Sequence, residues 1–471
     1  MAAKKDADNK TKELRERLLT QSKHGSLRVD EETVTAAGEY CEGYKRFLDT
    51  GKTEREAAAE AVRLAEEKGF VPFERGKKYE AGAKVYYLNR EKAVILAVIG
   101  TEPVEKGVLI SAAHIDSPRL DLKPRPLYEA DDLAYFKTHY YGGIKKYQWT
   151  TVPLSLHGVV CLADGSKVTV NIGESPEDPQ FCVTDLLIHL ASEQMGRKAS
   201  DVIRGENLNL LIGSMPLRDD EGGDSVKLNI MRILNEKYGI VEDDFLSAEL
   251  EAVPAMPARD IGFDRSLIGA YGHDDRVCAY PSLTALLELD APEKTCVVCL
   301  ADKEETGSDG NTGLNSSYLK YFIHDLAEMQ GGCGRAALSA SRCLSADVNA
   351  AYDPNFADVY EKRNASVING GVVLTKYTGA RGKGGTSDAS AEYVAACRGI
   401  FDEENVVWQI GELGRVDAGG GGTVAMYIAN LDVDVVDIGV PVLSMHAPYE
   451  IVSKLDVYMT HCAISAFFRK G

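Results

Sequence analysis

Histidines and carboxylates stand at the ends of several apolar runs in this sequence of 471 residues. The clearest case is "CLADKEETGSDG", residues 299–310, where a hydrophobic stretch ends in Glu304 and Glu305 before a turn rich in Gly, Ser and Asp. An ionised carboxylate at the end of a buried strand needs a cation or another partner. Because several runs end in this way, we expect their ends to meet at one site. The other endings carry His114, Asp116, Asp274, Asp275, Asp347 and His446.

These residue types suit divalent metal ions. Two imidazoles and three carboxylates favour zinc, with cobalt or manganese as possible substitutes. Five ligands are too many for one tetrahedral zinc with an open position, but they fit two metals about 3.5–4 Å apart, bridged by one carboxylate and one water. Two zinc ions, three carboxylates and one hydroxide also sum to zero formal charge. The predicted ligands are His114, Asp274, Glu305, Asp347 and His446.

Spacing assigns roles to two further carboxylates. His114 and Asp116 are two residues apart in an extended segment and therefore share a face. Asp116 can then hold the far ring nitrogen of His114, which fixes the tautomer and raises the basicity of the ligand. Glu304 and Glu305 are neighbours whose side chains would point apart in a strand. One is expected to be a ligand and the other a general base acting on metal-bound water.

The elements that must position these residues alternate between strands and helices. Apolar, β-branched runs such as "GVLISAAHID", "KTCVVCLAD" and "DVVDIGVPVLS" predict strands, and the closing "SKLDVYMTHCAISAFFRKG" predicts an amphipathic helix. Repeated strand–helix units predict an α/β fold with a mixed, mostly parallel sheet flanked by helices. In such sheets, ligands bind at the carboxyl ends of the strands.

The pattern changes between about residues 124 and 258. Short alternating runs such as "LSLHGVVCLADGSKVTVNIG" predict hairpins there, and a polar stretch rich in Gly and Asp follows. We therefore expect an inserted β-rich domain over residues 124–258. The catalytic domain would then be discontinuous and comprise residues 1–123 and 259–471.

Composition narrows the class of partner and the compartment. The net charge of −19 disfavours binding to nucleic acid or to anionic membrane surfaces. The charged N-terminus has no apolar signal core, and no run approaches the roughly 20 apolar residues of a membrane span. The ten cysteines lie singly in apolar surroundings, apart from Cys296 and Cys299 in a β-branched run, so buried thiols are expected rather than a zinc knuckle or disulfides. A cytoplasmic protein is predicted.

Six motifs, taken in order, resemble the aspartyl aminopeptidase/aminopeptidase I family of dinuclear zinc exopeptidases. They are "HIDSP", "HDDR", "DKEETGS", "SADVNAAYDP", "GGGGT" and "MHAPYE", and they cover nearly the whole chain. The resemblance implies a zinc-exopeptidase type of fold and aminopeptidase activity. It also implies that Asp274 bridges two metals, that His114 and Asp347 complete one site, and that Glu305 and His446 complete the other. Glu304 would be the general base.

The family resemblance further implies an oligomer. The family places a histidine of a neighbouring subunit in each active site, and "TDLLIHLA" matches the segment that carries it. His189 is therefore the candidate, both for contacting the substrate and for stabilising the developing oxyanion. The implied assembly is a hollow dodecamer built from dimers, with residues 124–258 forming the dimer contact and limiting access to short peptides.

Specificity remains open at this point. Lys376, in "VVLTKYTG", is a candidate for binding an acidic substrate side chain, and a solvated lysine is the alternative. The sequence departs from the usual family motifs in "HDDR", "DVNAA" and "MHAPYE", and in "KYTGARGKGGTSDASAE" near the expected substrate pocket. The glycines of "GGGGT", residues 419–423, lack the Lys-Ser/Thr of a phosphate loop and favour close backbone approach to substrate or metal.

The sequence thus predicts a metal-dependent aminopeptidase that removes the first residue from peptides with a free N-terminus. Two zinc ions with a bridging water, and Glu304 as the base, would carry the reaction. A dinuclear metallohydrolase acting as a carboxypeptidase or as an N-acyl-amino-acid deacylase is one alternative. The other is a metal-stabilised oligomeric scaffold without catalysis, against which the intact base glutamate argues.

Overall fold

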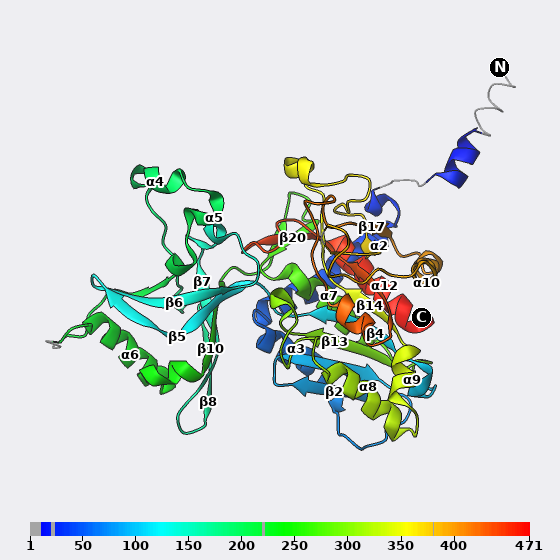
Figure 1. Ribbon diagram of the computed structural model, residues 1–471, viewed down its shortest axis with the longest axis horizontal. Coiled ribbons are helices and arrows are strands. Elements are labelled where there is room, and N and C mark those ends of the chain that lie inside the picture. The colour runs from blue at the N-terminus through cyan, green and yellow to red at the C-terminus, as the bar shows by residue number, and fades with distance from the viewer. Residues whose placement is uncertain (1–10, 20–23, 219–221, 380) are drawn as a thin grey trace.

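The protein has two lobes lying side by side (Figure 1). The computed structural model describes residues 11–19, 24–218, 222–379 and 381–471. One lobe is built on a nine-stranded mixed sheet with helices on both faces, and the other on a six-stranded antiparallel sheet. The α/β fold with a mixed sheet, predicted from the alternation of strands and helices, is confirmed.

The nine-stranded sheet places four parallel strands at its centre. β13, β4, β14 and β18 run parallel to one another, so their carboxyl ends lie along one edge. β3 joins this group antiparallel to β13, and β16 joins it antiparallel to β18. The order is β1 (Val71–Pro72), β2 (Lys84–Asn89), β3 (Ala93–Val98), β13 (Cys296–Ala301), β4 (Leu109–His114), β14 (Arg342–Ala346), β18 (Asp434–Gly439), β16 (Val372–Thr375) and β17 (Trp408–Ile410).

Each face of this sheet is covered by its own helices, because the buried strands are apolar on both sides. In β3, Val94, Leu96 and Val98 pack into one core while Ala93 and Ile95 pack into the other. One face carries α2 (Glu31–Thr50), α3 (Glu54–Glu66), α7 (His273–Leu287), α10 (Ala391–Glu403) and α12 (Lys454–Lys470). The opposite face carries α8 (Tyr318–Met329), α9 (Gly334–Ser339) and α11 (Ala425–Ala429).

The second lobe spans β5 to β10, and its strands pair antiparallel throughout. It has its own core, in which Trp149 is fully buried, and α6 (Ser225–Tyr238) packs on β6. Its sheet starts at Arg119, a few residues before the predicted start of the insert. The order is β8 (Lys167–Ile172), β7 (Leu154–Cys161), β10 (Ala248–Pro254), β5 (Arg119–Ala130), β6 (Leu133–Tyr141) and β9 (Leu210–Gly213), with the short helices α4 (Ser192–Met195) and α5 (Ala199–Val202) in its loops.

Two small sheets complete the first lobe. One consists of β11 (Arg259–Ile261), β12 (Leu267–Ala270) and β20 (Glu450–Ser453), and the other of β15 (Asn349–Ala350) and β19 (Pro441–Val442). β12 leads into α7, and β19 and β20 flank the loop that carries His446. These small sheets therefore hold two of the segments with predicted metal ligands.

A polar seam joins the two lobes. His157 of β7 places Nδ1 2.8 Å from Glu56 Oε1 of α3 and Nε2 3.1 Å from Glu174 Oε1. Lys52 Nζ lies 2.8 Å from Glu174 Oε2 and donates to the carbonyl oxygen of Pro254. Burial alone would lower the pKa of His157, but its hydrogen bonds to Glu174 and Glu56 raise it above the ordinary value.

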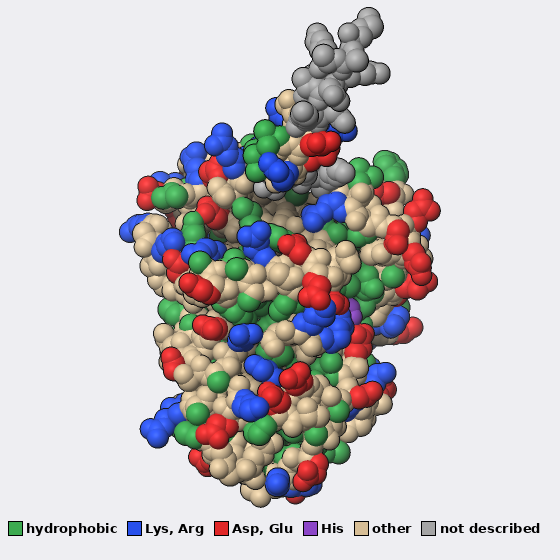
Figure 2. Space-filling view, turned by 90° about the vertical axis from the view of Figure 1, so that its right-hand side faces the viewer, with side chains coloured by type: hydrophobic (Ala, Val, Ile, Leu, Met, Phe, Trp, Pro, Cys, Tyr) green, Lys and Arg blue, Asp and Glu red, His purple; other side chains and the backbone are tan. Residues whose placement is uncertain are grey.

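The outer surface shows no concentration of one charge on the face in Figure 2, where acidic and basic side chains are interspersed. Among the described residues, no helix is long and apolar enough to cross a bilayer. Cys296 and Cys299 are buried in β13, as the β-branched run predicts.

Candidate metal centre

The predicted ligands come from segments at the carboxyl edge of the parallel strands. His114 is the last residue of β4, and Asp347 follows the last residue of β14. Glu305 comes shortly after β13, Asp274 lies in the first turn of α7, and His446 lies in the loop between β19 and β20. Because these strands are parallel, tertiary folding brings together residues separated by more than 300 positions.

Asp274 stands at the middle of the cluster. Its Oδ1 lies 3.1 Å from His114 Nε2, and its Oδ2 lies 3.2 Å from His446 Nε2. Burial alone would raise the pKa of Asp274, but the hydrogen bonds from both histidines outweigh burial and hold the pKa below its ordinary value. One carboxylate thus presents each of its oxygens to a different imidazole.

Two groups of three potential ligands share Asp274. One contains His114 and Asp347, the other Glu305 and His446, and within each group the ligand atoms lie within 4.8 Å of one another. Glu305 Oε1 is buried without a hydrogen-bond partner. Burial, and after it the charge of neighbouring carboxylates, raises the pKa of Glu305 and of Asp347, and the nearby histidines offset this only in part. Nitrogen and oxygen donors in this number fit two divalent ions.

Glu304 and Glu305 do not lie in a strand. β13 ends at Ala301, Lys303 adopts a left-handed conformation with φ 69°, and the two glutamates open a short 3-10 turn, Glu304–Thr306. The premise that they alternate as strand neighbours is wrong, although the side chains still diverge. Glu304 Oε2 lies 3.8 Å from His114 Nε2, whereas Glu305 Oε2 lies 3.6 Å from His446 Nε2. Burial raises the pKa of Glu304 to about 7.

Asp116 is fully buried and connects β4 to this turn. Its Oδ1 lies 3.3 Å from His114 Nδ1, and its two oxygens accept the backbone N–H groups of Glu304 and Glu305 at 3.1 and 3.2 Å. The Tyr141 hydroxyl donates to Asp116 Oδ2 at 2.7 Å. Burial would raise the pKa of Asp116, but the His114 hydrogen bond and charge lower it. One carboxylate therefore orients both a predicted ligand and the predicted base.

A family model described as aminopeptidase I zinc metalloprotease (M18) matches residues 47–468. The chain belongs to the M18 family. It is 51% identical over 461 residues to a probable M18 family aminopeptidase 1 of Clostridium acetobutylicum, which covers 96% of this chain and 98% of that protein.

Solved structures agree with the M18 assignment. The M18 aminopeptidase of Thermotoga maritima matches with a TM-score of 0.92 and 44% identity, covering 96% of this chain and 100% of that one. The mApe1 dodecamer of yeast matches with a TM-score of 0.74 at 19% identity, covering 93% and 97%, which is a likeness of fold alone. The resemblance drawn from the six motifs is confirmed. This M18 protein is a zinc metallo-aminopeptidase, and so a hydrolase.

Two groups that sequence reasoning missed hold the segments with the predicted ligands in place. Glu450, 1% exposed, accepts the backbone N–H of His446 through Oε1 at 2.7 Å and that of Asp274 through Oε2 at 3.1 Å. The carbonyl oxygen of Gly143 lies 2.7 Å from His446 Nδ1. Glu450 stands in the motif "MHAPYE" and could have been singled out there. No sequence feature marks Gly143, because it acts through its backbone carbonyl oxygen and has no side chain.

A cavity of about 470 Å³ opens on the metal centre. Gly420, Gly421 and Gly422 of "GGGGT" line it, consistent with the close backbone approach expected of these glycines. Leu413 and Asp437 also line it. Further apolar lining comes from Val348, Met426 and Met445.

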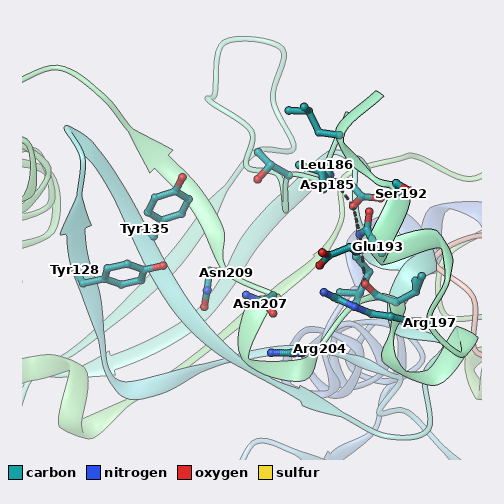
Figure 3. A pocket seen from close by; sticks show the side chains of 15 residues that line it. Tyr128, Tyr135, Asp185, Leu186, Ser192, Glu193, Arg197, Arg204, Asn207 and Asn209 are labelled. Atoms are coloured by element: carbon teal, nitrogen blue, oxygen red, sulfur yellow. Dashed lines mark hydrogen bonds between the residues drawn. The ribbon is translucent and has the colours of Figure 1, made fainter. Parts of the chain in front are cut away.

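His189 and Lys376 lie outside this cavity lining. His189 is exposed in the 3-10 turn Ile188–Leu190 of the second lobe, so it does not sit in an apolar helix. Lys376 Nζ pairs with Asp388 Oδ1 at 3.1 Å. A separate hollow of about 700 Å³ lies beside the His189 turn, where Gln194 donates to Asp185. Tyr128 and Tyr135, which stack on one another, line it (Figure 3).

Proposed function

We propose that this M18 enzyme removes N-terminal residues from peptides at a centre for two metal ions, most simply zinc, with cobalt or manganese as alternatives. Asp274 would bridge the two ions, His114 and Asp347 would complete one site, and Glu305 and His446 the other. The placement of the two Asp274 oxygens opposite different histidines, at 3.1 and 3.2 Å, is the observation that carries this proposal. A single-metal site would leave one of the two groups of ligands without a cation.

Metal ions held by these residues would supply Lewis-acid chemistry, which polarises a carbonyl and acidifies a bound water. Glu304 lies beside this centre and is held there by the bond from its backbone N–H to Asp116. It accepts the proton of the attacking water and passes it to the leaving amine. A carboxylate held next to a metal-bound water is suited to accept a proton and to return it.

The free α-ammonium of the substrate would be held by carboxylates at the rim of the cavity. A peptide without a free N-terminus offers no such cation, which favours exopeptidase activity. This point separates the aminopeptidase from an N-acyl-amino-acid deacylase or a carboxypeptidase. An assay with aminoacyl, N-acetyl-aminoacyl and carboxypeptidase substrates tests it, because only the first series should be hydrolysed.

We assign residues 1–123 and 259–471 to the catalytic domain and residues 124–258 to an inserted dimerisation domain. The segment around His189 carries exposed apolar side chains, which on a soluble domain mark a contact surface. They are Leu186, Leu187, Ile188 and Leu190. A partner subunit seated there would bring its own His189 toward a neighbouring active site, where it would donate to the oxyanion and contact substrate.

By analogy with the yeast mApe1 dodecamer, the assembly proposed is a dodecamer built from dimers. Lys376 could contact substrate only if its ion pair with Asp388 opens. The ion pair favours the alternative, a solvated lysine.

The decisive test of the base is Glu304→Ala, with Glu304→Gln as the isosteric companion. Both should lower kcat by about 10²–10⁴-fold while metal content, measured by elemental analysis, stays equal to that of the native enzyme. Undiminished turnover with full metal content would remove Glu304 as the base. No hydrolysis of any aminoacyl substrate by native, metal-loaded protein would favour the scaffold instead.

A further inference from the structure

Asp437 is a buried carboxylate that lines the active-site cavity without a cation beside it. It lies on β18, 4% exposed, level with Ser345 of β14 on one side and Thr375 of β16 on the other. Asp437 Oδ1 has no hydrogen-bond partner among the described residues, and neither has the hydroxyl of Ser345. Such an atom is costly to bury, so a partner from outside the chain is the natural complement.

The rest of the cavity supplies no positive side chain for it. The described residues that line the cavity include no Lys or Arg, and the one imidazole, His446, faces Asp274 and Glu305. Asp437 also lies outside both groups of residues that can hold a metal ion. The charge of Asp437 therefore remains after the ligand carboxylates are neutralised by metals.

Part of the lining of the same cavity suits an aliphatic stem. Leu413, Met426 and Met445 line the cavity together with Val348. A cavity of about 470 Å³ has room for a long, unbranched side chain next to the peptide backbone. A cavity with apolar lining and a buried carboxylate outside the metal-holding groups matches lysine and arginine, whose methylene stems pack on apolar surface while the charged end pairs with an anion.

We propose that Asp437 binds the cationic end of the substrate's first side chain, so that this aminopeptidase prefers peptides beginning with Lys or Arg. This inference rests on the proposed function, since it places the first residue in the cavity beside the metal centre. The desolvation of Asp437 is already part of the folded state, so an incoming ammonium gains a charge-assisted hydrogen bond at low additional cost. An N-terminal Asp or Glu would instead meet a like charge.

The ionisation of Asp437 is compatible with this role. Burial raises its pKa to about 6, with the hydroxyls of Thr423 and Ser345 close enough to oppose that rise in part without completing a hydrogen bond to Oδ1. The carboxyl is therefore mostly ionised at neutral pH.

The test compares kcat/KM for aminoacyl-coumarins of Lys, Arg, Leu, Met and Glu in the metal-loaded native enzyme and in Asp437→Asn. Native enzyme should favour Lys and Arg over Leu. Asp437→Asn should lose about 10- to 100-fold on Lys and Arg, the value of a hydrogen bond to a charged group, and change less than about threefold on Leu and Met. Asp434→Asn, an exposed carboxylate on the same strand, is the matched control and should change none of these ratios.

A second measurement needs no variant. Free lysine and norleucine differ only by the terminal ammonium, so lysine should inhibit the native enzyme at least about tenfold more tightly. Equal inhibition by the two, or an equal loss on every substrate in Asp437→Asn, would overturn the role of Asp437. Native enzyme that cleaves Leu and Met but favours neither Lys nor Arg would overturn this inference alone, whereas enzyme that cleaves no aminoacyl-coumarin would overturn the proposed function with it.

Discussion

The rim of the nine-stranded sheet and the second lobe use their polar residues differently. At the rim, His114, Asp116 and Asp274 are almost fully buried, and each contacts several others. In the second lobe, His189 is exposed on a three-residue turn among exposed apolar side chains. Chemistry that needs fixed geometry thus sits where strand ends and helix starts hold the backbone, whereas the second lobe presents a surface suited to a partner.

The separation is not complete. Tyr141, the last residue of β6, donates to Asp116, and the nearby Gly143 carbonyl contacts His446. Two contacts from the second lobe therefore reach the metal centre of the first lobe. The polar seam around His157 joins the lobes at a second place. The comparison teaches that the second lobe contributes to the site by orienting the predicted ligands rather than by supplying them.

The largest expected effect comes from the shared carboxylate at the rim. Asp274→Asn removes the charge that faces both histidines, so binding at both metal positions should weaken together. We expect a loss of bound metal and a fall in kcat/KM of about 10³-fold or more, measured by elemental analysis and aminoacyl-coumarin assay. Retention of two ions per chain would contradict Asp274 as the bridge.

A smaller effect is expected at Glu450, which touches only backbone. Glu450→Gln keeps the shape but leaves one of the two N–H groups, of His446 or Asp274, facing an amide nitrogen. Metal affinity should fall by about 10- to 100-fold, measured by competition with a chelator, and the visible spectrum of the cobalt-loaded protein should shift. Glu450→Ala should lower the metal affinity further. An unchanged spectrum and affinity would mean that Glu450 only supports the fold.

The contact between the lobes gives a test of intermediate size. Tyr141→Phe removes the hydroxyl that donates to Asp116 and leaves the ring in place. We expect kcat to fall by about tenfold with little change in KM, because one hydrogen bond to a charged group orients the carboxylate. Tyr140→Phe, on the neighbouring exposed residue, is the control. Equal kcat values for Tyr141→Phe and native enzyme would mean that this contact from the second lobe does not contribute to catalysis.

If the second lobe forms the contact between subunits, a change on its surface should affect assembly but not folding. Leu187→Asp places a charge in the exposed apolar group beside His189. The oligomer should dissociate, as seen by analytical ultracentrifugation, and activity should fall as His189 of each partner is lost, while the unfolding temperature of the isolated chain stays the same. Leu27→Asp, at an exposed leucine in the first lobe, should leave the oligomer intact. If the Leu187→Asp oligomer stays intact, the subunit interface must lie elsewhere on the chain.

The smallest effect concerns the seam. The pKa of His157 is raised in the folded chain by Glu174 and Glu56, so its contribution to stability is full below the unfolded value of 6.5 and is lost as the pH rises through the raised folded value. The difference in unfolding temperature between native protein and His157→Gln should therefore shrink by about 2 °C from pH 6 to pH 9. A pH-independent difference, equal to that of the exposed His139→Gln control, would argue against the charged pair.

Much of the fold and of the site was predictable, because the information was local. Apolar β-branched runs followed by helical periodicity predicted the mixed sheet, and residues such as His114 and Asp347 were visible at the ends of those runs. The turn at Glu304 was misjudged, because a left-handed Lys303 ends the strand early and no local signal marks it. The roles of Gly143 and Tyr141 could not be predicted, since they depend on a contact between lobes that are distant in sequence.

The sequence by itself determined the donor types, their order along the chain and the strand ends that carry them, because these follow from side-chain chemistry and periodicity over short windows. Only the tertiary structure decided that Asp274 faces two histidines, that Glu450 ties together two segments with predicted ligands, and that Asp437 Oδ1 lacks a hydrogen-bond partner among the described residues. Those facts depend on the packing of strands and lobes hundreds of residues apart, where a displacement of about 1 Å separates a contact from none.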